Sequence, residues 1–232
     1  MDNFRSAEST QVSAVSVYMS QVYMWMTAGL LLTAAVAWYA STSEAMLQLL
    51  YGNSMSLIVL VVLMIGLPIG LQKMLPRLSA GMATMWFMAY SAVVGLALCS
   101  VFIVYTHTSI ASTFIITAGM FGGMSVYGMV TKRDLTGMGS FMIMGLWGLL
   151  LAMIVNWFLQ SPALYYAIGA IGVIVFTGLT AWDTQKLRQF GENAPTGDAA
   201  VMRRGVILGA LTLYLDFINL FLMLLRLLGD RR

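Results

Sequence analysis

The sequence predicts an all-α polytopic membrane protein, folded as a bundle of seven transmembrane helices. Only 9% of its 232 residues are charged and 60% are hydrophobic, whereas a soluble domain has about 25% charged residues. The charges are also bunched, and no Asp, Glu, Lys or Arg occurs in residues 9–43, 45–72, 78–131 or 135–182. Stretches of this length fit bilayer spans of about 20 apolar residues each. The composition excludes a cytosolic enzyme, a disordered chain and a nucleic-acid-binding protein, which needs clustered Lys and Arg.

The helices can be placed in order along the chain from these stretches and from the polar turns within them. Residues 78–131 are too many for one spanning helix at a rise of 1.5 Å per residue, so they must hold two, divided at the polar run 106–109. Residues 135–182 divide at Pro162, because proline disfavours helix at the residue before it and commonly opens the next helix. The seven predicted helices cover about residues 22–40, 56–71, 82–104, 110–130, 138–159, 163–182 and 206–228.

The polar segments between and beyond these helices predict the domain organisation. Residues 1–21 form a polar N-terminal segment, residues 22–228 a single seven-helix membrane domain and residues 229–232 a C-terminal tail. The N-terminal segment lacks the basic start of a cleaved signal peptide, so we expect the first helix to be retained. A polar linker is predicted over residues 191–204, which are rich in Gly, Pro, Asp and Asn.

Small residues predict where the helices approach one another. Gly66 and Gly70 lie four residues apart in the second predicted helix, and Gly119 and Gly123 do so in the fourth. Gly205 and Gly209 have the same spacing where the seventh predicted helix begins. This spacing lets helix backbones pack closely in a membrane. Cys99, the one cysteine, lies in an apolar run and is expected to pack as a small hydrophobic residue. We therefore expect the glycine pairs to lie at helix crossings.

The distribution of basic residues predicts the orientation. Loops rich in Lys and Arg stay in the cytoplasm, and the loops after the first, third and fifth helices contain neither residue. Nine basic residues lie in the N-terminal segment and in the loops after helices two, four and six: Arg5, Lys73, Arg77, Lys132, Arg133, Lys186, Arg188, Arg203 and Arg204. The N-terminus is therefore expected in the cytoplasm, and after seven spans the C-terminus falls on the periplasmic side. Arg231 and Arg232 do not fit a periplasmic C-terminus, because basic residues favour the cytoplasmic side. A seventh segment that enters the membrane and returns to the cytoplasmic side is therefore an open alternative.

Two acids interrupt the apolar pattern. Asp183 ends the sixth predicted helix, and Asp216 lies near the middle of the seventh, with Asn219 on the same helix face. An ionisable residue at the centre of a membrane helix costs about 2.5–3.5 kcal/mol even on insertion scales, and it indicates a functional site by default. Asp183 alone could also be a hydrated acid at a helix end. Asp216 is therefore the stronger of the two candidates.

The residues around these acids resemble a known family. Residues 181–187 read Ala-Trp-Asp-Thr-Gln-Lys-Leu, and residues 213–226 read Leu-Tyr-Leu-Asp-Phe-Ile-Asn-Leu-Phe-Leu-Met-Leu-Leu-Arg. These strings resemble the paired signatures of the Bax inhibitor-1 family, also called transmembrane Bax inhibitor motif proteins. The resemblance extends over the whole chain, including the Lys-Arg-Asp-Leu segment at residues 132–135. It is greatest to the bacterial inner-membrane branch, which implies a location in the cell inner membrane.

This resemblance implies a function as well as a fold. The last helix would be central, and the family is associated with a pH-sensitive calcium leak whose sensor is a pair of facing aspartates. Carried over by position, these are Asp183 and Asp216, which would also be the candidate calcium ligands. A basic residue beyond the second helix would act as a latch that holds Asp183 in the closed state. Arg77 is the first choice for this residue and Lys73 the second. The second helix has no acid, which puts a calcium ligand there in doubt.

The chemistry of such a pair follows from the two residues themselves. Two carboxylates that meet in a low-dielectric site cannot both ionise cheaply, so they share a proton and titrate as a coupled unit. With the proton they hydrogen bond and hold their helices together. Without it they repel each other, or Arg77 captures one, and the charged site attracts a divalent cation. We hypothesise that this contact sets cation permeability.

Other functions remain open at this point. The second candidate is a regulator that transports nothing and binds a membrane protease or a stress-response partner. Proton-coupled transport of another solute would use the same pair. An intramembrane aspartyl protease is disfavoured because Asp216 follows Leu-Tyr-Leu rather than a Gly-x-Gly run, so we expect no enzyme and no cofactor. The expected partners are the calcium ion, the lipid bilayer and a membrane protein, and the oligomeric state stays open.

Overall fold

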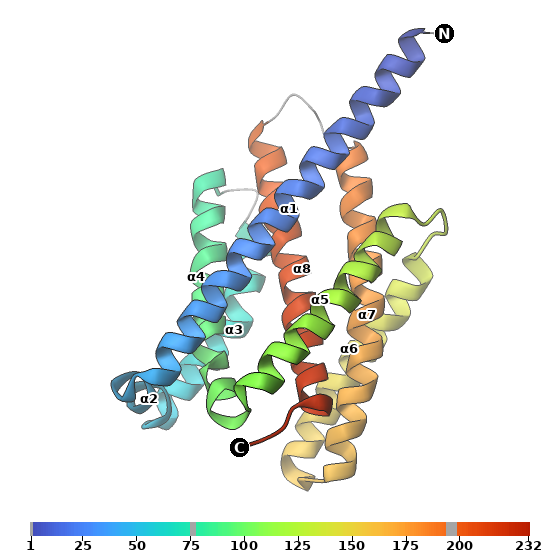
Figure 1. Ribbon diagram of the computed structural model, residues 1–232. Helices are drawn as coiled ribbons and strands as arrows, with labels where there is room; N and C mark the ends of the chain where they lie inside the picture. Colours follow the sequence, from blue (N-terminus) through green and yellow to red (C-terminus); the bar gives the residue numbers. More distant parts are fainter. Residues whose placement is uncertain (1, 75–77, 194–198) are drawn as a thin grey trace. The chain divides into compact units, whose positions relative to one another are not determined.

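The computed structural model describes residues 2–74, 78–193 and 199–232, and the side chains among these from residue 14 onward. Throughout the described residues the regular structure is helical, apart from one isolated bridge between Tyr105 and Arg231. The helices, shown in Figure 1, are α1 (Asp2–Thr42), α2 (Glu44–Tyr51), α3 (Ser54–Met74), α4 (Ala80–Val104), α5 (His107–Val130), α6 (Thr136–Leu159), α7 (Pro162–Asn193) and α8 (Ala199–Leu228).

Seven of these helices are long and apolar enough to cross a membrane, which confirms the prediction of an all-α polytopic fold. The most apolar window of α8 is 67% buried, the largest share among the seven spans, whereas the windows of α3 and α6 are each 11% buried. An apolar helix with little burial inside the protein is suited to face lipid. The high burial of α8 agrees with the central last helix that the family resemblance implies.

The short helix α2 was not predicted from the sequence. Its N-cap is Ser43, whose side chain accepts a hydrogen bond from the amide of Met46, and Glu44 lies in the first turn. Leu50 is buried in a cluster that includes Cys99 of α4, so the cysteine packs as expected. The polar residues around position 43 therefore start a helix rather than forming only a turn, because a capping serine and an acid both favour a helix N-terminus.

Three helices extend well beyond their predicted bounds. α1 begins at Asp2, and α7 continues to Asn193 rather than ending near residue 182. α8 begins at Ala199, so most of the predicted linker over residues 191–204 is helical. The prediction ended each helix where the apolar run ended, but polar residues continue a helix readily outside the hydrocarbon layer. At 1.5 Å per residue α7 is about 48 Å long, well beyond a hydrocarbon core of about 30 Å.

The chain divides into two compact units, which are described separately. Unit 1 comprises Met1–Val104 and Phe190–Tyr214, and in it α1 packs along α4 and α3 packs on α4 (Figure 1). Unit 2 comprises Tyr105–Gln189 and Leu215–Arg232. Helix α8 therefore contributes its first half to the core of unit 1 and its second half, with Asp216, to unit 2.

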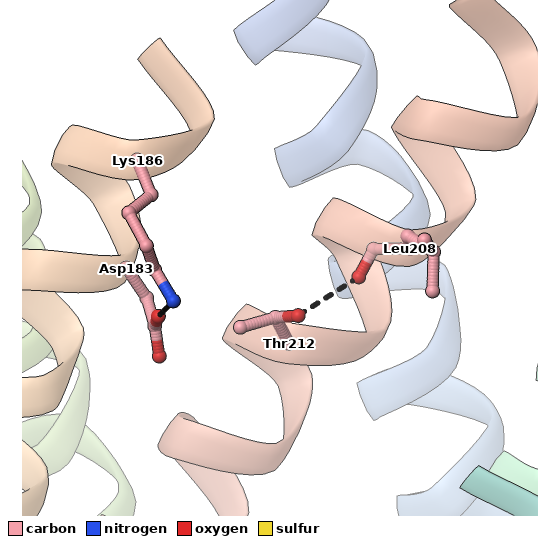
Figure 2. Close-up of polar contacts among 4 residues, drawn as sticks. All are labelled: Asp183, Lys186, Leu208 and Thr212. Carbon is pink, nitrogen blue, oxygen red and sulfur yellow. Dashed lines mark hydrogen bonds and ion pairs between the residues drawn. The ribbon is translucent and has the colours of Figure 1, made fainter. Parts of the chain in front are cut away.

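In unit 1, Tyr214 fixes α8 just before the candidate site begins. Its hydroxyl lies 2.6 Å from the hydroxyl of Thr33 in α1, which donates to the carbonyl of Ser91 in α4 at 2.8 Å. The ring of Phe87 packs edge-on against Tyr214, with the ring centroids 5.7 Å apart. Two residues earlier in α8, the Thr212 hydroxyl donates to the Leu208 carbonyl of its own helix (Figure 2). Tyr214 thus joins α8 to α1 two residues before Asp216.

Only some of the glycines chosen from the sequence mark close helix contacts. A side chain added at Gly66, Gly119 or Gly123 would meet no described atom within 4 Å, so the packing prediction is wrong for these three. Gly70 and Gly205 do face neighbours, because an added Cβ would lie 3.1 Å from the Trp86 ring and 2.5 Å from the Phe190 ring, respectively. Spacing alone does not show which face of a helix is covered.

Candidate functional site

Two buried carboxyl groups meet in unit 2. Asp183 of α7 and Asp216 of α8 have exposed fractions of 7% and 5%. The Asp183 carboxyl is a charged neighbour that acts on the Asp216 carboxyl. Asp216 Oδ2 is a buried oxygen with no hydrogen-bond partner among the described residues. Two ionised carboxylates offer only acceptors, so the two groups can hydrogen bond to each other only when one of them carries a proton. A shared proton would therefore join the pair.

Two glycines on neighbouring helices allow α7 to approach at the level of Asp183. An added Cβ at Gly128 in α5 would strike the carbonyl of Ala181 and lie 3.0 Å from Thr184. An added Cβ at Gly139 in α6 would overlap the ring of Trp182. Thus Trp182 and Thr184, the residues on either side of Asp183, pack against the backbone of Gly139 and Gly128, where a side chain would not fit. These two positions, rather than the glycine pairs of the sequence analysis, are the close helix crossings of this site.

Gln185 connects the next part of the signature to the loop between α5 and α6. Its side-chain oxygen accepts from the amide of Leu135 at 2.9 Å, and its side-chain nitrogen donates to the carbonyl of Arg133 at 2.8 Å. In the same loop Asp134 accepts from the amide and the hydroxyl of Thr136, and these hydrogen bonds lower the pKa of the Asp134 carboxyl. The segment at 132–135 that carries part of the family resemblance is therefore held directly on α7.

Removing the Gln185 side chain should loosen this loop. The variant Gln185→Ala leaves the Leu135 amide and the Arg133 carbonyl without partners, which costs about 1–3 kcal/mol when the groups are buried. In hydrogen-exchange mass spectrometry we expect the Leu135 amide to exchange its hydrogen faster, by the factor that corresponds to this loss of free energy. The matched control is Gln48→Ala, whose exposed side chain lies on α2. Equal protection of the loop in both variants would show that Gln185 does not hold it.

Lys186 makes the ion pair of the site. Its Nζ lies 2.5 Å from Asp183 Oδ1, one turn away on the same helix (Figure 2). The same Nζ lies 3.7 Å from the centroid of the Trp182 ring. The Lys186 side chain is 47% exposed, whereas that of Asp183 is 9% exposed. In the sequence, Lys186 counts toward the predicted orientation and lies close to Asp183 at the end of the helix. Its spacing of three residues from Asp183 is what indicates a direct contact on one helix face.

The remaining candidate residues lie elsewhere or beyond the described residues. Arg77 falls in residues 75–77, outside the described part of the chain. Lys73 is exposed in the last turn of α3, which belongs to unit 1. The side-chain amide of Asn219 donates to the carbonyl of Leu215 in its own helix at 2.8 Å. A latch at Arg77 or Lys73 and a supporting role for Asn219 therefore stay predictions.

The pair could supply only part of a cation's coordination shell. Among the described residues no group of three or more His, Cys, Asp or Glu side chains lies close enough together to hold a metal. Calcium takes six to eight oxygen ligands, and Asp183 and Asp216 together have four carboxylate oxygens. The pair by itself therefore supplies fewer oxygens than a calcium ion takes.

The C-terminal tail binds the opposite end of unit 2. The amide of Thr106 donates to the carbonyl of Asp230 at 3.1 Å, and the amide of Asp230 donates to Ser109 at 3.0 Å. The guanidinium of Arg231 lies 5.0 Å from the centroid of the Tyr165 ring. The tail thus lies where α5 begins, whereas Gln185 binds the loop where α5 has ended. Helix α8 is continuous from Ala199 to Leu228, and the side of the membrane on which the C-terminus lies stays a prediction.

Comparison with known proteins agrees with these features. The family model described as "Inhibitor of apoptosis-promoting Bax1" matches residues 15–232. The Inner membrane protein YbhL of Escherichia coli strain K12 is 58% identical over the whole length of both chains. The chain belongs to the Bax inhibitor-1 family. Another relative of this Bax inhibitor-1 protein is an uncharacterized protein of Borreliella burgdorferi, 42% identical over 97% of each chain. The uncharacterized protein YrjE of Lactococcus lactis is 39% identical over 93% of this chain and 91% of its own.

The family resemblance inferred from the two signature strings is thereby confirmed. With seven candidate spans and a full-length inner-membrane relative, this Bax inhibitor-1 protein is a multi-pass inner-membrane protein. Its two signatures lie on α7 and α8, and the structure brings their acids together in unit 2.

Proposed function

We propose that this Bax inhibitor-1 protein is a pH-sensitive cation leak channel of the inner membrane, that calcium is its permeant ion, and that the Asp183–Asp216 pair is its gate. The observation that carries the proposal is the contact of two buried carboxyl groups from two helices, each long enough to cross a bilayer. Such residues are retained in a membrane interior chiefly for ion pathways and proton relays. The pair is therefore a better candidate for a gate than any other polar group in the described part of unit 2.

The gating step follows from the proton count. When the pair holds one proton, the two carboxyl groups hydrogen bond and keep α7 and α8 in contact. When the proton leaves, two negative charges face each other in a site of low dielectric constant, where their repulsion is strong. A divalent cation relieves this repulsion, so the deprotonated pair both loosens the helix contact and attracts calcium. Cation flux is therefore expected to rise as the pH rises.

Liposomes that contain only this protein test the proposal. We expect external calcium to enter vesicles loaded with a calcium-sensitive dye faster than it enters empty vesicles. A single proton changes the population of the open state by at most about tenfold per pH unit, so the flux should rise with pH by up to this factor. Flux no greater than in empty vesicles at every pH would contradict the channel proposal and favour the regulator that transports nothing. Competition by another solute would indicate a proton-coupled transporter.

A further inference from the structure

The ion pair between Lys186 and Asp183 bears directly on how a cation could reach the aspartates. Asp183 has two charged neighbours, the carboxyl of Asp216 and the ammonium of Lys186. The ammonium is 2.5 Å from Asp183 Oδ1, an oxygen that is itself buried. The charged groups that act on Asp216 are Asp183 and Lys186. The candidate site therefore already contains one positive charge, supplied by the chain.

Lys186 is placed so that it can leave this site. Nearly half of its side chain is exposed, and the Trp182 ring supports its ammonium at 3.7 Å without enclosing it. Lysine carries its charge on a flexible four-carbon chain, so the ammonium can move to water while the backbone stays in place. An ion pair of this exposure contributes little to stability. Its effect on what else can bind Asp183 is therefore the larger consequence.

We propose that Lys186 is a tethered counter-cation of the aspartate pair, which a divalent cation must displace from Asp183 before it can bridge both carboxylates. The inference rests on the proposed function in treating the pair as the place through which the cation passes. In this arrangement the ammonium occupies the oxygen that the entering cation needs. It keeps the affinity of the pair for divalent cations low, so that the ion is not retained.

Binding of Mn²⁺ to the purified full-length protein tests this inference independently of transport. Free and bound Mn²⁺ are distinguished by electron paramagnetic resonance in detergent at fixed pH. We expect Lys186→Met to bind Mn²⁺ at least about tenfold more tightly than the unmodified protein, because a positive charge next to the ligand oxygen is removed. Lys186→Gln should show the same gain if the methionine variant does not fold. Lys186→Arg, which keeps the charge, should stay within about threefold of the unmodified protein.

Two further variants show whether the gain belongs to the site. Lys132→Met removes the same charge from an exposed position in the neighbouring loop and should leave Mn²⁺ affinity unchanged. Lys186→Met combined with Asp216→Asn should lose the gain, because one bridging carboxylate is gone. Equal affinities for Lys186→Met and Lys132→Met, or a gain that persists without Asp216, would overturn the inference. Calcium flux measured on the same preparations separates the two proposals. An affinity gain without any flux supports the counter-cation and contradicts the channel.

Discussion

Asp216→Asn is expected to abolish the pH dependence of calcium flux. The asparagine amide donates a hydrogen bond permanently to Asp183 and cannot lose a proton, so the contact between α7 and α8 stays closed at every pH. Flux in liposomes should then remain at the low value that the unmodified protein shows at acidic pH. The expected change across each pH unit falls from as much as about tenfold to none. Asp183→Asn should behave in the same way, because either variant removes one half of the proton-sharing pair.

The matched control for this prediction is Asp134→Asn. Asp134 lies in the exposed loop between α5 and α6, and the Thr136 amide and hydroxyl lower the pKa of its carboxyl, which stays ionised near neutral pH. Asparagine keeps the acceptor oxygen that caps Thr136, so the loop should remain folded. Its flux and pH profile should match those of the unmodified protein. An unchanged profile in Asp216→Asn, or an equal loss in Asp134→Asn, would contradict the gating role of the pair.

Gly128→Ala is expected to destabilise the protein although it adds only one methyl group. The nearest atoms to the added Cβ belong to the backbone of Ala181, two residues before Asp183, and backbone cannot move aside without shifting α7. Overpacking of this kind typically costs about 1–3 kcal/mol. It also removes the close approach that places Asp183 against its neighbours. We expect a lower midpoint of thermal unfolding in detergent, together with a weaker pH dependence of flux.

Gly123→Ala, on the same helix, is the control for this substitution. An added Cβ there would meet no described atom within 4 Å. Alanine is favoured over glycine inside a helix by up to about 1 kcal/mol, so this variant should be as stable as the unmodified protein or slightly more so. The two alanines therefore have effects of opposite sign on one helix. Similar unfolding midpoints for both variants would show that Gly128 is not a close helix crossing.

The sequence predicts the membrane fold well because apolar length is a property of the chain itself. Stretches without charge placed six of the spans, the apolar run around Asp216 placed the seventh, and the scarcity of charge made Asp183 and Asp216 visible as a pair. The ends of α7 and α8 were placed less well, since a helix that leaves the bilayer continues through polar residues. Helix α2 was missed because its eight residues depend on a serine cap and on packing around Cys99.

The parts of the site that the sequence did not predict depend on contacts between helices. Gly128 and Gly139 have no i, i+4 glycine partner that would mark them, and only the fold shows that Ala181 and Trp182 pack against them. The sequence shows Gln185 only as a polar residue near a helix end. Its hydrogen bonds to the loop at residues 133–135 are visible only in the fold. Lys186 was counted for orientation, and its position beside Asp183 makes it a further candidate, besides Arg77 and Lys73, for the cation that holds this aspartate.

The central claim is that Asp183 and Asp216 share one proton, and infrared spectroscopy tests it most directly. A protonated carboxyl group has a carbonyl stretching band distinct from that of a carboxylate, and aspartate labelled with ¹³C shifts this band. We expect a labelled protonated-carboxyl band to persist at a pH where the exposed Asp134 is ionised. This band should disappear as the pH rises and calcium flux begins. It should also change in Asp216→Asn. Two carboxylates that remain ionised over the whole pH range in which flux changes would contradict the claim.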